Sequence, residues 1–583
     1  MRAALLLGFV IACGGASRSP APAASARRVA SNVLRADYAG SEACADCHAE
    51  LYQRWAASPM RNMTRDASKA TIRAPFDGAT LRVGPDTATM TMDGGARIVI
   101  VTTPTGRETF RVTKVVGGRY REDFVGVSEH GGPERVLPAT YVFATQSWRY
   151  KGYSVMVKER PAMSTRAVWS QECIACHNTL PLATVLYDEL YGPGLPGYQG
   201  KLSDRTLPER LVWPTRSHDD AALSRALADE IRFLGDTPPD GGLRTMLPAA
   251  ASASEHLLDG TKLVELGVGC EACHNGSRSH AHDPAKLPAF ETRSSLLGVS
   301  PPRGQDGTRA QWINQTCAKC HTVLFTRYPW TWEGGTRTKN LGGSTTNSGE
   351  GRDFKLGACA TAMACTTCHD PHDTDVRDKL DALATPAGNR VCAQCHAQIA
   401  AKLTEHTHHQ ATSAGSACVQ CHMPRKNMGL DYDLVRYHRI GSPTDRVRVE
   451  ADRPLECALC HADKTVESLV STMEQWWGKR FDRGALRMLY GDNLNVNVIR
   501  ATLVRGKPHE QAVAIATLGH TGDRSIVPLV APHLAHDYPL VRYYALRALE
   551  RVTGTRIAID VGAPAADVKL QVDAWLTAAA ASR

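Results

Sequence analysis

Sixteen of the 18 cysteines in this 583-residue chain fall into eight copies of one motif, in which two cysteines enclose two residues and a histidine follows directly. We number the motifs 1 to 8 in chain order. The cysteine pairs are Cys44 and Cys47, Cys173 and Cys176, Cys270 and Cys273, Cys317 and Cys320, Cys365 and Cys368, Cys392 and Cys395, Cys418 and Cys421, and Cys457 and Cys460. The histidines that follow them are His48, His177, His274, His321, His369, His396, His422 and His461.

The fixed histidine decides which chemistry these cysteines serve. A cysteine pair alone fits a zinc site, a redox dithiol or half of an iron–sulfur site, but none of these requires histidine at the next position. Covalent haem attachment does, because two thiols add to the vinyl groups and the next imidazole binds the iron. The sequence therefore predicts eight c-type haems, with the eight motif histidines as proximal iron ligands.

The second axial ligand of each iron determines what such a haem can do. An iron with two protein ligands carries electrons, whereas an iron with an open face can bind and reduce small molecules. The distal candidates outside the motifs are Met60, His280, His282, His372, His406, His408 and His438.

Some of these candidates have local alternatives. Met60, followed by Met63, lies just after motif 1 and either ligates the first iron or packs against a porphyrin edge. His406, His408 and His409 form an HTHH run from which one ligand is expected.

Other histidines carry weaker expectations. A structural role is as plausible as ligation for His130, His218 and His256. Four more histidines follow the last motif in a helical region and are expected at the surface, namely His509, His520, His533 and His536.

The two remaining cysteines lie outside the motifs. Residues 1–12 read as a signal peptide, and VIAC resembles a bacterial lipobox that makes Cys13 a lipid anchor, the alternative being an ordinary signal peptide. Export places the chain in an oxidising compartment. Residues 13–36 are rich in Ala, Ser, Pro and Arg and read as a flexible tether. Cys359 is interpreted as a buried free thiol.

The elements that must position these groups form a mixed α+β chain. A first haem segment is expected at 37–70, followed by a β-rich module at 71–160 with alternating Val, Ile and Thr and Gly-rich turns. A mostly helical and irregular core with seven haems follows at 161–463, in which 340–357 reads as a loop. The last part, 464–583, is helical.

Several stretches resemble a group of bacterial multihaem cytochromes with doubled CxxCH motifs, here of the octahaem type. They are GSEACADCHAELYQRW, LGVGCEACHNGSRSH, ACTTCHDPHD, ACVQCHMPRKNMG and CALCHADKTVESLV. The segment GHTGDRSIVPLVAPHLAHDYPLVRYYALRALERVTG resembles a HEAT repeat, so 464–583 is expected to be HEAT-like and to cap the haem region or to dock a protein.

The resemblance also implies distal ligands. It places His280, His372, one of His406 and His408, and His438 at distal positions. Relatives commonly carry a histidine where this chain has Met60.

Two functions fit these observations. The first is electron transfer among redox proteins, such as other cytochromes or quinol-oxidising complexes. The protein would be a lipid-anchored periplasmic or cell-surface protein, and the outer membrane is the expected location of the anchor. The second is reduction of nitrite, hydroxylamine or a related nitrogen oxide at one open haem. Electron transfer is preferred, because enough histidines exist to close most irons and no motif is modified.

The net charge of +9 does not indicate nucleic acid. Removing the signal leaves about +8, and a ferric haem with two ionised propionates contributes about −1 and a ferrous one about −2. Eight haems then bring the total to about 0 when oxidised and about −8 when reduced. The excess of Arg and Lys is therefore interpreted as counter-charge to propionates.

Overall fold

A computed structural model describes residues 27–151, 156, 158, 162–191, 211–321, 349–374, 376–429 and 431–581. The expected signal peptide and Cys13 lie outside the described residues. Helices and strands both occur, so the mixed α+β class is confirmed. In these residues no helix is both long enough and apolar enough to cross a membrane.

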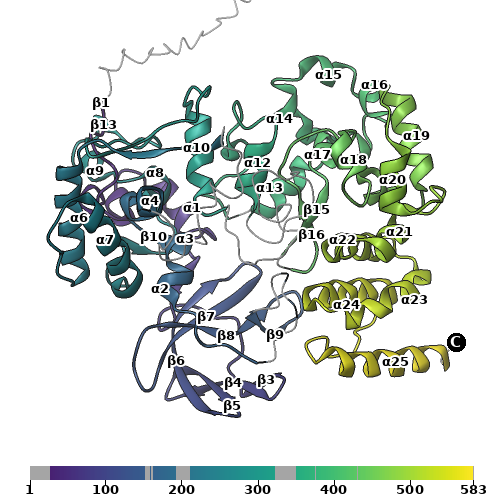
Figure 1. Cartoon of the computed structure of the whole chain (residues 1–583), viewed down its shortest axis with the longest axis horizontal. Helices are drawn as coiled ribbons and strands as arrows, with labels where there is room; N and C mark the ends of the chain where they lie inside the picture. Colours follow the sequence, from purple (N-terminus) through teal and green to yellow (C-terminus); the bar gives the residue numbers. More distant parts are fainter. Residues whose placement is uncertain are drawn as a thin grey trace, which may run out of the picture.

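One eight-stranded antiparallel sheet dominates the β structure, drawn in blue and violet in Figure 1. Its strands follow the order β3-β4-β5-β6-β7-β8-β9, and β2 pairs with β6. The strands are β2 (Thr64–Asp66), β3 (Ala79–Val83), β4 (Asp86–Asp93), β5 (Ala96–Thr103), β6 (Gly106–Gly117), β7 (Arg121–Ser128), β8 (Arg135–Val142) and β9 (Ser147–Tyr150). The two ends of this path, β3 and β9, also pack against each other.

Local sequence explains how the sheet forms. Alternating side chains bury one face of β4 and β5, as period-two patterning requires. Gly94 and Gly95 connect these strands with φ values of 51° and 85°, the left-handed conformation that a tight hairpin turn needs. The buried face is filled by aromatic rings, with Phe76 and Phe124 centred 5.2 Å apart.

Three helices form a layer beside residues 169–172, which directly precede motif 2. The long helices α6 (Asp220–Leu234) and α7 (Leu243–Leu257) pack on each other, and α4 (Leu182–Tyr191) packs on α7. Asp219 caps α6 by accepting the N–H of Ala222 at 2.9 Å, and Gly235 ends the helix in a left-handed conformation.

Short elements carry the motifs through the middle of the molecule. The helices among them are α1 (Ala49–Ala56), α2 (Trp169–Glu172), α3 (Ile174–His177), α8 (Cys270–His274), α9 (Arg278–His282), α10 (Arg309–Ala318), α12 (Glu350–Leu356), α13 (Val376–Leu383), α14 (Arg390–Ala393), α15 (Ala397–Ala401), α16 (Leu403–Thr407), α17 (Cys418–His422) and α18 (Arg446–Glu450). The 3-10 turns are η1 (Arg35–Asp37), η2 (Ser41–Cys44), η5 (Cys365–Thr367), η6 (Pro386–Asn389), η7 (Ala414–Ser416) and η8 (Glu456–Leu459). Small two-stranded pairs join these segments, namely β1 (Arg27–Arg28) with β13 (Lys286–Leu287), β10 (Asn178–Thr179) with β12 (Glu265–Leu266), β11 (Thr215–Ser217) with β14 (Leu297–Val299), and β15 (Arg425–Met428) with β16 (Leu434–Arg436).

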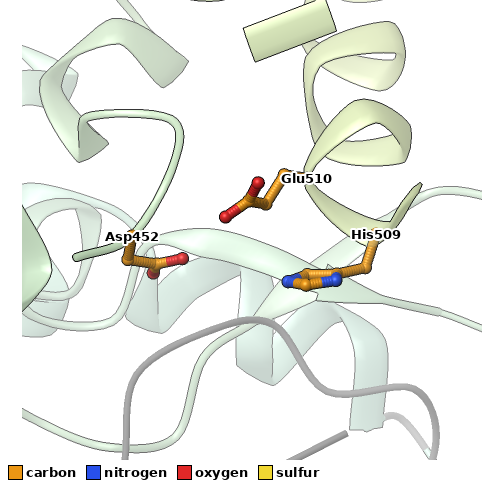
Figure 2. Close-up of side chains that lie close together, drawn as sticks. All are labelled: Asp452, His509 and Glu510. Carbon is orange, nitrogen blue, oxygen red and sulfur yellow. The ribbon is translucent and has the colours of Figure 1, made fainter. Parts of the chain in front are cut away.

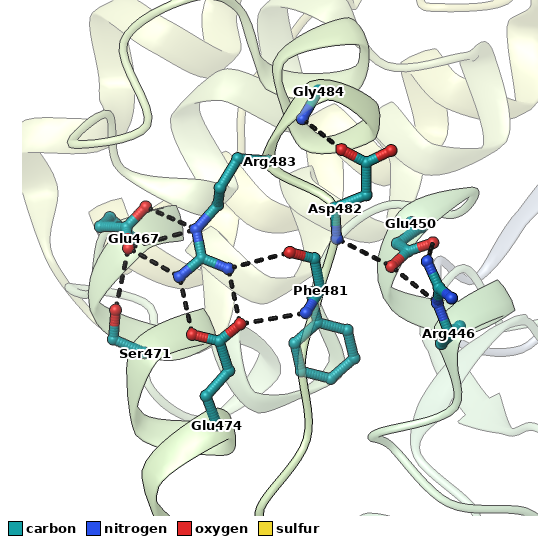
Figure 3. A network of polar contacts seen from close by, with 9 residues as sticks. All are labelled: Arg446, Glu450, Glu467, Ser471, Glu474, Phe481, Asp482, Arg483 and Gly484. Atoms are coloured by element: carbon teal, nitrogen blue, oxygen red, sulfur yellow. Dashed lines mark hydrogen bonds and ion pairs between the residues drawn. The ribbon is translucent and has the colours of Figure 1, made fainter.

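The C-terminal helices stack beside the sheet and are drawn in yellow-green to yellow in Figure 1. They are α19 (Val466–Trp477), α20 (Arg483–Tyr490), α21 (Val498–Arg505), α22 (Pro508–His520), α23 (Val527–Val530), α24 (Pro539–Thr553) and α25 (Ala565–Ala581), with the turns η9 (Arg524–Ile526) and η10 (Ala531–Ala535). Arg483 joins α20 to α19 through ion pairs with Glu467 at 2.9 Å and Glu474 at 2.8 Å, as Figure 3 shows.

These helices share a hydrophobic core with the sheet and the β15–β16 hairpin. Tyr432 in the hairpin stacks on Tyr543 of α24 with ring centres 4.7 Å apart, and Arg149 of β9 lies over the same Tyr543 ring. Asp433 accepts from His520 at 2.9 Å and pairs with Arg551 at 3.0 Å. The C-terminal helices are therefore packed onto the rest of the molecule.

Two local expectations from the sequence are wrong. Residues 350–356 were expected in a loop but form α12, of which Arg352, Asp353 and Phe354 are buried. His509 was expected at the surface but is 1 % exposed in the first turn of α22. Arg352, Asp353 and His509 are polar residues, and an apolar pattern in the sequence does not mark polar residues as buried.

Candidate functional site

Each CxxCH motif is folded as one helical turn. The histidine N–H donates to the carbonyl of the first cysteine in motif 1 at 2.9 Å and in motifs 4, 6 and 8 at 3.0 Å. Residues three and four apart on such a turn lie on one face. Both thiols and the imidazole can therefore reach one porphyrin.

Five of the motif histidines face a second histidine from elsewhere in the chain. The ring centres are 6.0 to 6.3 Å apart in every case. The pairs are His48 with His280, His274 with His372, His369 with His438, His422 with His406, and His461 with His409.

This separation fits a metal ion between two imidazoles. An imidazole nitrogen binds a metal at about 2 Å, and the ring centre lies about 1.1 Å behind it, so two rings on opposite sides of one ion are about 6 Å apart. Rings in direct stacking contact would lie nearer, as His408 does on Trp476 at 4.4 Å. The five pairs thus have the donor set and the spacing of bis-histidine haem iron.

Hydrogen bonds fix the orientation of several of these rings. Backbone carbonyls lie 3.0 Å from Nδ1 of His280 and of His438, 2.6 Å from Nδ1 of His409 and 2.9 Å from Nδ1 of His422. Nδ1 of His372 lies 3.2 Å from the carboxylate of Asp370. A ring held at Nδ1 keeps Nε2 as its ligand atom, which is how proteins usually orient metal-binding histidine.

The other sequence candidates lie differently. Met60 is half-buried, and its carbonyl accepts the N–H of Val268 at 3.0 Å, but the ring opposite His48 is that of His280. His282 is exposed at the end of α9. His408 stacks on Trp476, so the HTHH run presents two histidines to motifs instead of the one expected.

In the described part of the chain, none of the three histidines with the weaker expectation of ligation, His130, His218 and His256, lies opposite a motif histidine. The side chains of His130 and His256 are 76 % and 62 % exposed. His218 lies against Gly298 in the β11–β14 pair.

Motifs 2, 4 and 6 have no second histidine ring opposite them among the residues that the structure describes. His321 of motif 4 instead has Nδ1 3.6 Å from a carboxylate oxygen of Glu350 in α12. A carboxylate behind a metal-bound imidazole raises the basicity of that ligand.

The segment between Phe354 and Ala417 lacks a core of buried apolar side chains in the part of the chain that the structure describes. Among the described residues, no hydrophobic side chain is buried between Phe354 and Ala417, a segment that contains motifs 5 and 6. A folded segment of this length needs apolar surface to bury. Covalent porphyrins would supply that surface, so the segment fits the haems that its motifs predict.

Cys359, the cysteine between motifs 4 and 5, is half-buried. Burial, and then the nearby thiols of Cys392 and Cys395 in motif 6, raise its pKa.

Sequence reasoning missed a buried polar cluster beside motif 8. Asp452, His509 and Glu510 bring their ligand-type atoms within 4.8 Å of one another, as Figure 2 shows. Lys426 contacts Asp452, and Arg453 donates to Glu510 at 3.0 Å, so cationic side chains already neutralise these carboxylates. The cluster joins α22 to the segment before motif 8.

Comparisons with known proteins bear on the motifs and on the chain as a whole. Residues 358–401, which contain motifs 5 and 6, match the family described as "Doubled CXXCH motif". Over 70 residues the chain is 39 % identical to phycocyanobilin lyase subunit alpha of Thermosynechococcus vestitus. The aligned residues make up 12 % of this chain and 25 % of that protein. The chain thus spans about a quarter of the length of this curated relative.

Among solved structures, the chain is similar to the outer cell wall cytochrome OcwA at 15 % sequence identity and a TM-score of 0.38. The alignment covers 88 % of this chain and 100 % of that chain. The family match, which rests on the motifs themselves, supports c-type haem binding at more than one site. The chain accordingly has the characteristics of a multihaem c-type cytochrome.

Proposed function

We propose that the chain is an octahaem c-type cytochrome that transfers electrons outside the cytoplasm. The observation that carries this proposal is the set of five histidine pairs with ring centres 6.0 to 6.3 Å apart. A bound haem supplies reversible one-electron chemistry at its iron. An iron closed by protein on both faces retains its ligands on reduction, which suits electron transfer better than substrate binding.

The residues of the chain bind and orient the cofactors. The eight cysteine pairs hold the porphyrins, and the motif histidines are the proximal ligands. We assign His280, His372, His438, His406 and His409 as distal ligands of motifs 1, 3, 5, 7 and 8. Met60 then packs beside motif 1 without ligating it, and His282 and His408 are not ligands.

Electron paramagnetic resonance of the oxidised holoprotein tests this assignment. We expect low-spin ferric haem to predominate, with at least five bis-histidine irons, and mass spectrometry to find eight haems per chain. Replacing His406 or His409 with Ala should each convert one iron to high spin, whereas His408→Ala should convert none. A spectrum of mainly high-spin haem would contradict the proposal.

The cellular location is proposed from the sequence. The VIAC stretch ending at Cys13 supports a lipid anchor, and the chain then works as a periplasmic or cell-surface lipoprotein with redox proteins as partners. Cys13→Ser should move the protein from the membrane fraction to the soluble fraction with its haem content unchanged. Retention of the variant in the membrane fraction would exclude this anchor.

A second candidate is reduction of nitrite, hydroxylamine or a related nitrogen oxide. The observation that favours it is Glu350 behind His321, because a more basic proximal imidazole donates electron density to the iron. Motif 4 is therefore where such a reaction would be sought. High-spin haem that is lost on replacing Cys317 and Cys320, together with nitrite-dependent reoxidation of the reduced protein, would support this candidate.

A further inference from the structure

Three pairs of motifs are joined by a hydrogen bond to the first cysteine of one motif. They are motifs 1 and 3, motifs 4 and 5, and motifs 6 and 7. Motif 1 is thus bonded to motif 3 and not to motif 2, so motifs that are neighbours in sequence are not always neighbours in space.

One side-chain position builds these three contacts. Ser41, Asn314 and Asn389 each lie three residues before the first cysteine of motifs 1, 4 and 6. Their side-chain oxygens accept the N–H of the first cysteine in the paired motif, namely Cys270 at 2.9 Å, Cys365 at 2.8 Å and Cys418 at 2.8 Å. Each accepted N–H belongs to the first residue of the motif turn, where no helical carbonyl is available.

The two asparagines repeat the same two-point geometry. The side-chain nitrogen of Asn314 donates to the carbonyl of Met363 at 2.9 Å, and that of Asn389 donates to the carbonyl of Ser416 at 2.9 Å. Both acceptors lie two residues before the first cysteine of the paired motif. With two hydrogen bonds, each asparagine amide therefore fixes both the distance of the paired motif from its own motif and the orientation of the paired motif.

Motif 2 has a different arrangement. Ser170 occupies the same position before Cys173, but its hydroxyl donates to the carbonyl of Glu255 at 3.1 Å. Its side-chain contact is therefore with helix α7 and not with another motif.

The first two capped pairs are adjacent in the molecule. Helix α8 of motif 3 packs on α10, which leads into motif 4.

The third capped pair is connected to motif 8. The histidine opposite His461 of motif 8 is His409, from the HTHH run that precedes motif 7.

We propose that motifs 1 and 3, motifs 4 and 5, and motifs 6 and 7 hold their cofactors as three adjacent pairs, and that Ser41, Asn314 and Asn389 are the positioning residues that set these pairs. This rests on the proposed haem attachment and electron transfer. Electrons can then pass between motifs 1 and 3 without passing through motif 2, which lies between them in the sequence.

A structure of the holoprotein by electron cryomicroscopy tests the pairing directly. We expect the motif 1 haem to lie beside that of motif 3, the motif 4 haem beside that of motif 5, and the motif 6 haem beside that of motif 7. A motif 2 haem that lies nearer to the motif 1 haem than the motif 3 haem does would overturn the proposal. This result does not depend on iron ligation, so it can fail or succeed independently of the proposed function.

Substitutions test the positioning role. In Asn389→Ala with eight haems attached, we expect a weaker haem–haem coupling signal in Soret circular dichroism and a shifted potential of the motif 6 and 7 haems. Asn389→Ser, which keeps an acceptor oxygen as Ser41 does, should restore much of both.

Ser170→Ala is the matched control, because it removes a side chain at the same motif position that does not contact a paired motif. It should leave the coupling signal unchanged. Equal changes in Asn389→Ala and Ser170→Ala, or no change in Asn389→Ala, would show that the asparagine does not position the pair.

Discussion

At the scale of single residues, a hydrogen bond at Nδ1 of a histidine ring leaves Nε2 of that ring as the atom that can bind iron. His280 combines a position opposite His48 with a backbone carbonyl on Nδ1. Met60 and His282 lie nearby in the sequence, but neither has this arrangement. The geometry therefore distinguishes three candidates that spacing alone could not rank.

Substituting these three residues gives a direct prediction. His280→Ala should convert one iron from low to high spin, because it removes the proposed distal ligand of motif 1. His282→Ala and Met60→Ala should leave the visible and resonance spectra unchanged. A high-spin signal in Met60→Ala with an unchanged His280→Ala spectrum would reverse the assignment.

Glu350 makes a second prediction at this scale. Glu350→Gln removes a negative charge 3.6 Å from His321, which stabilises the ferric state of the iron bound there. The potential of one haem should therefore rise by tens of millivolts in a spectroelectrochemical titration. Asp229→Asn, which removes an exposed charge in α6, is the control and should leave all potentials in place.

The motifs and their proximal histidines could be predicted from sequence because all three groups lie within five residues. The pairing of distal histidines could not, because His280 reaches motif 1 and His438 reaches motif 5 only after the chain folds. The capping role of Asn314 is likewise invisible in sequence, since its partner lies in another motif.

At the scale of elements, strands with clear alternation and the helix that begins at Pro508 were predictable, whereas α12 and the burial of His509 were not. Both exceptions involve buried polar side chains. Arg352 pairs with its neighbour Asp353 at 3.0 Å, and Glu510, next to His509, accepts a hydrogen bond from Arg453 in a distant segment. Polar burial of this kind gives no periodic apolar signal.

The polar cluster at α22 should be important for stability. Lys426 is fully buried and pairs with Asp452 and Glu456. Lys426→Met leaves these carboxylates without that cation, so we expect a loss of about 3–5 kcal/mol in the free energy of unfolding. Urea unfolding followed by far-UV circular dichroism measures it.

Lys402→Met is the control, because this lysine is 70 % exposed in a surface pair with Glu405. It should change stability by about 0.5 kcal/mol or less. Equal effects of the two substitutions would show that the cluster adds no stability.

The sheet contains an acid-sensitive group. Burial disfavours the charged form of Asp123, but Arg121, Lys151 and the Thr140 hydroxyl outweigh it and lower the pKa of Asp123 to about 2. A lowered folded-state pKa gives stability that is complete above the usual pKa near 4 and is lost as the pH falls toward 2. The melting temperature should therefore fall over this range, and less steeply in Asp123→Asn.

At the scale of the whole molecule, the proposed cofactors would change the charge of the protein. The polypeptide has a net charge of +9 and an isoelectric point of about 8.7. If all eight motifs carry haem as proposed, ferric haems with ionised propionates contribute about −8. Isoelectric focusing of the oxidised holoprotein should give a value well below that of the polypeptide, and reduction should increase its migration toward the anode. A focusing point unchanged from the polypeptide value would mean neutralised propionates or fewer haems.

The histidine pairs also have a consequence for the order in which the haem sites are completed. Motifs 1, 3 and 5 precede the histidines that face them in the chain, whereas the partners of motifs 7 and 8 precede their motifs. Under the proposed export and ligation, the irons of motifs 1, 3 and 5 lack their distal ligands until later segments have emerged and folded. Motif 1 is separated from its partner His280 by the longest stretch of chain, so the completed coordination of its iron marks a late stage of assembly.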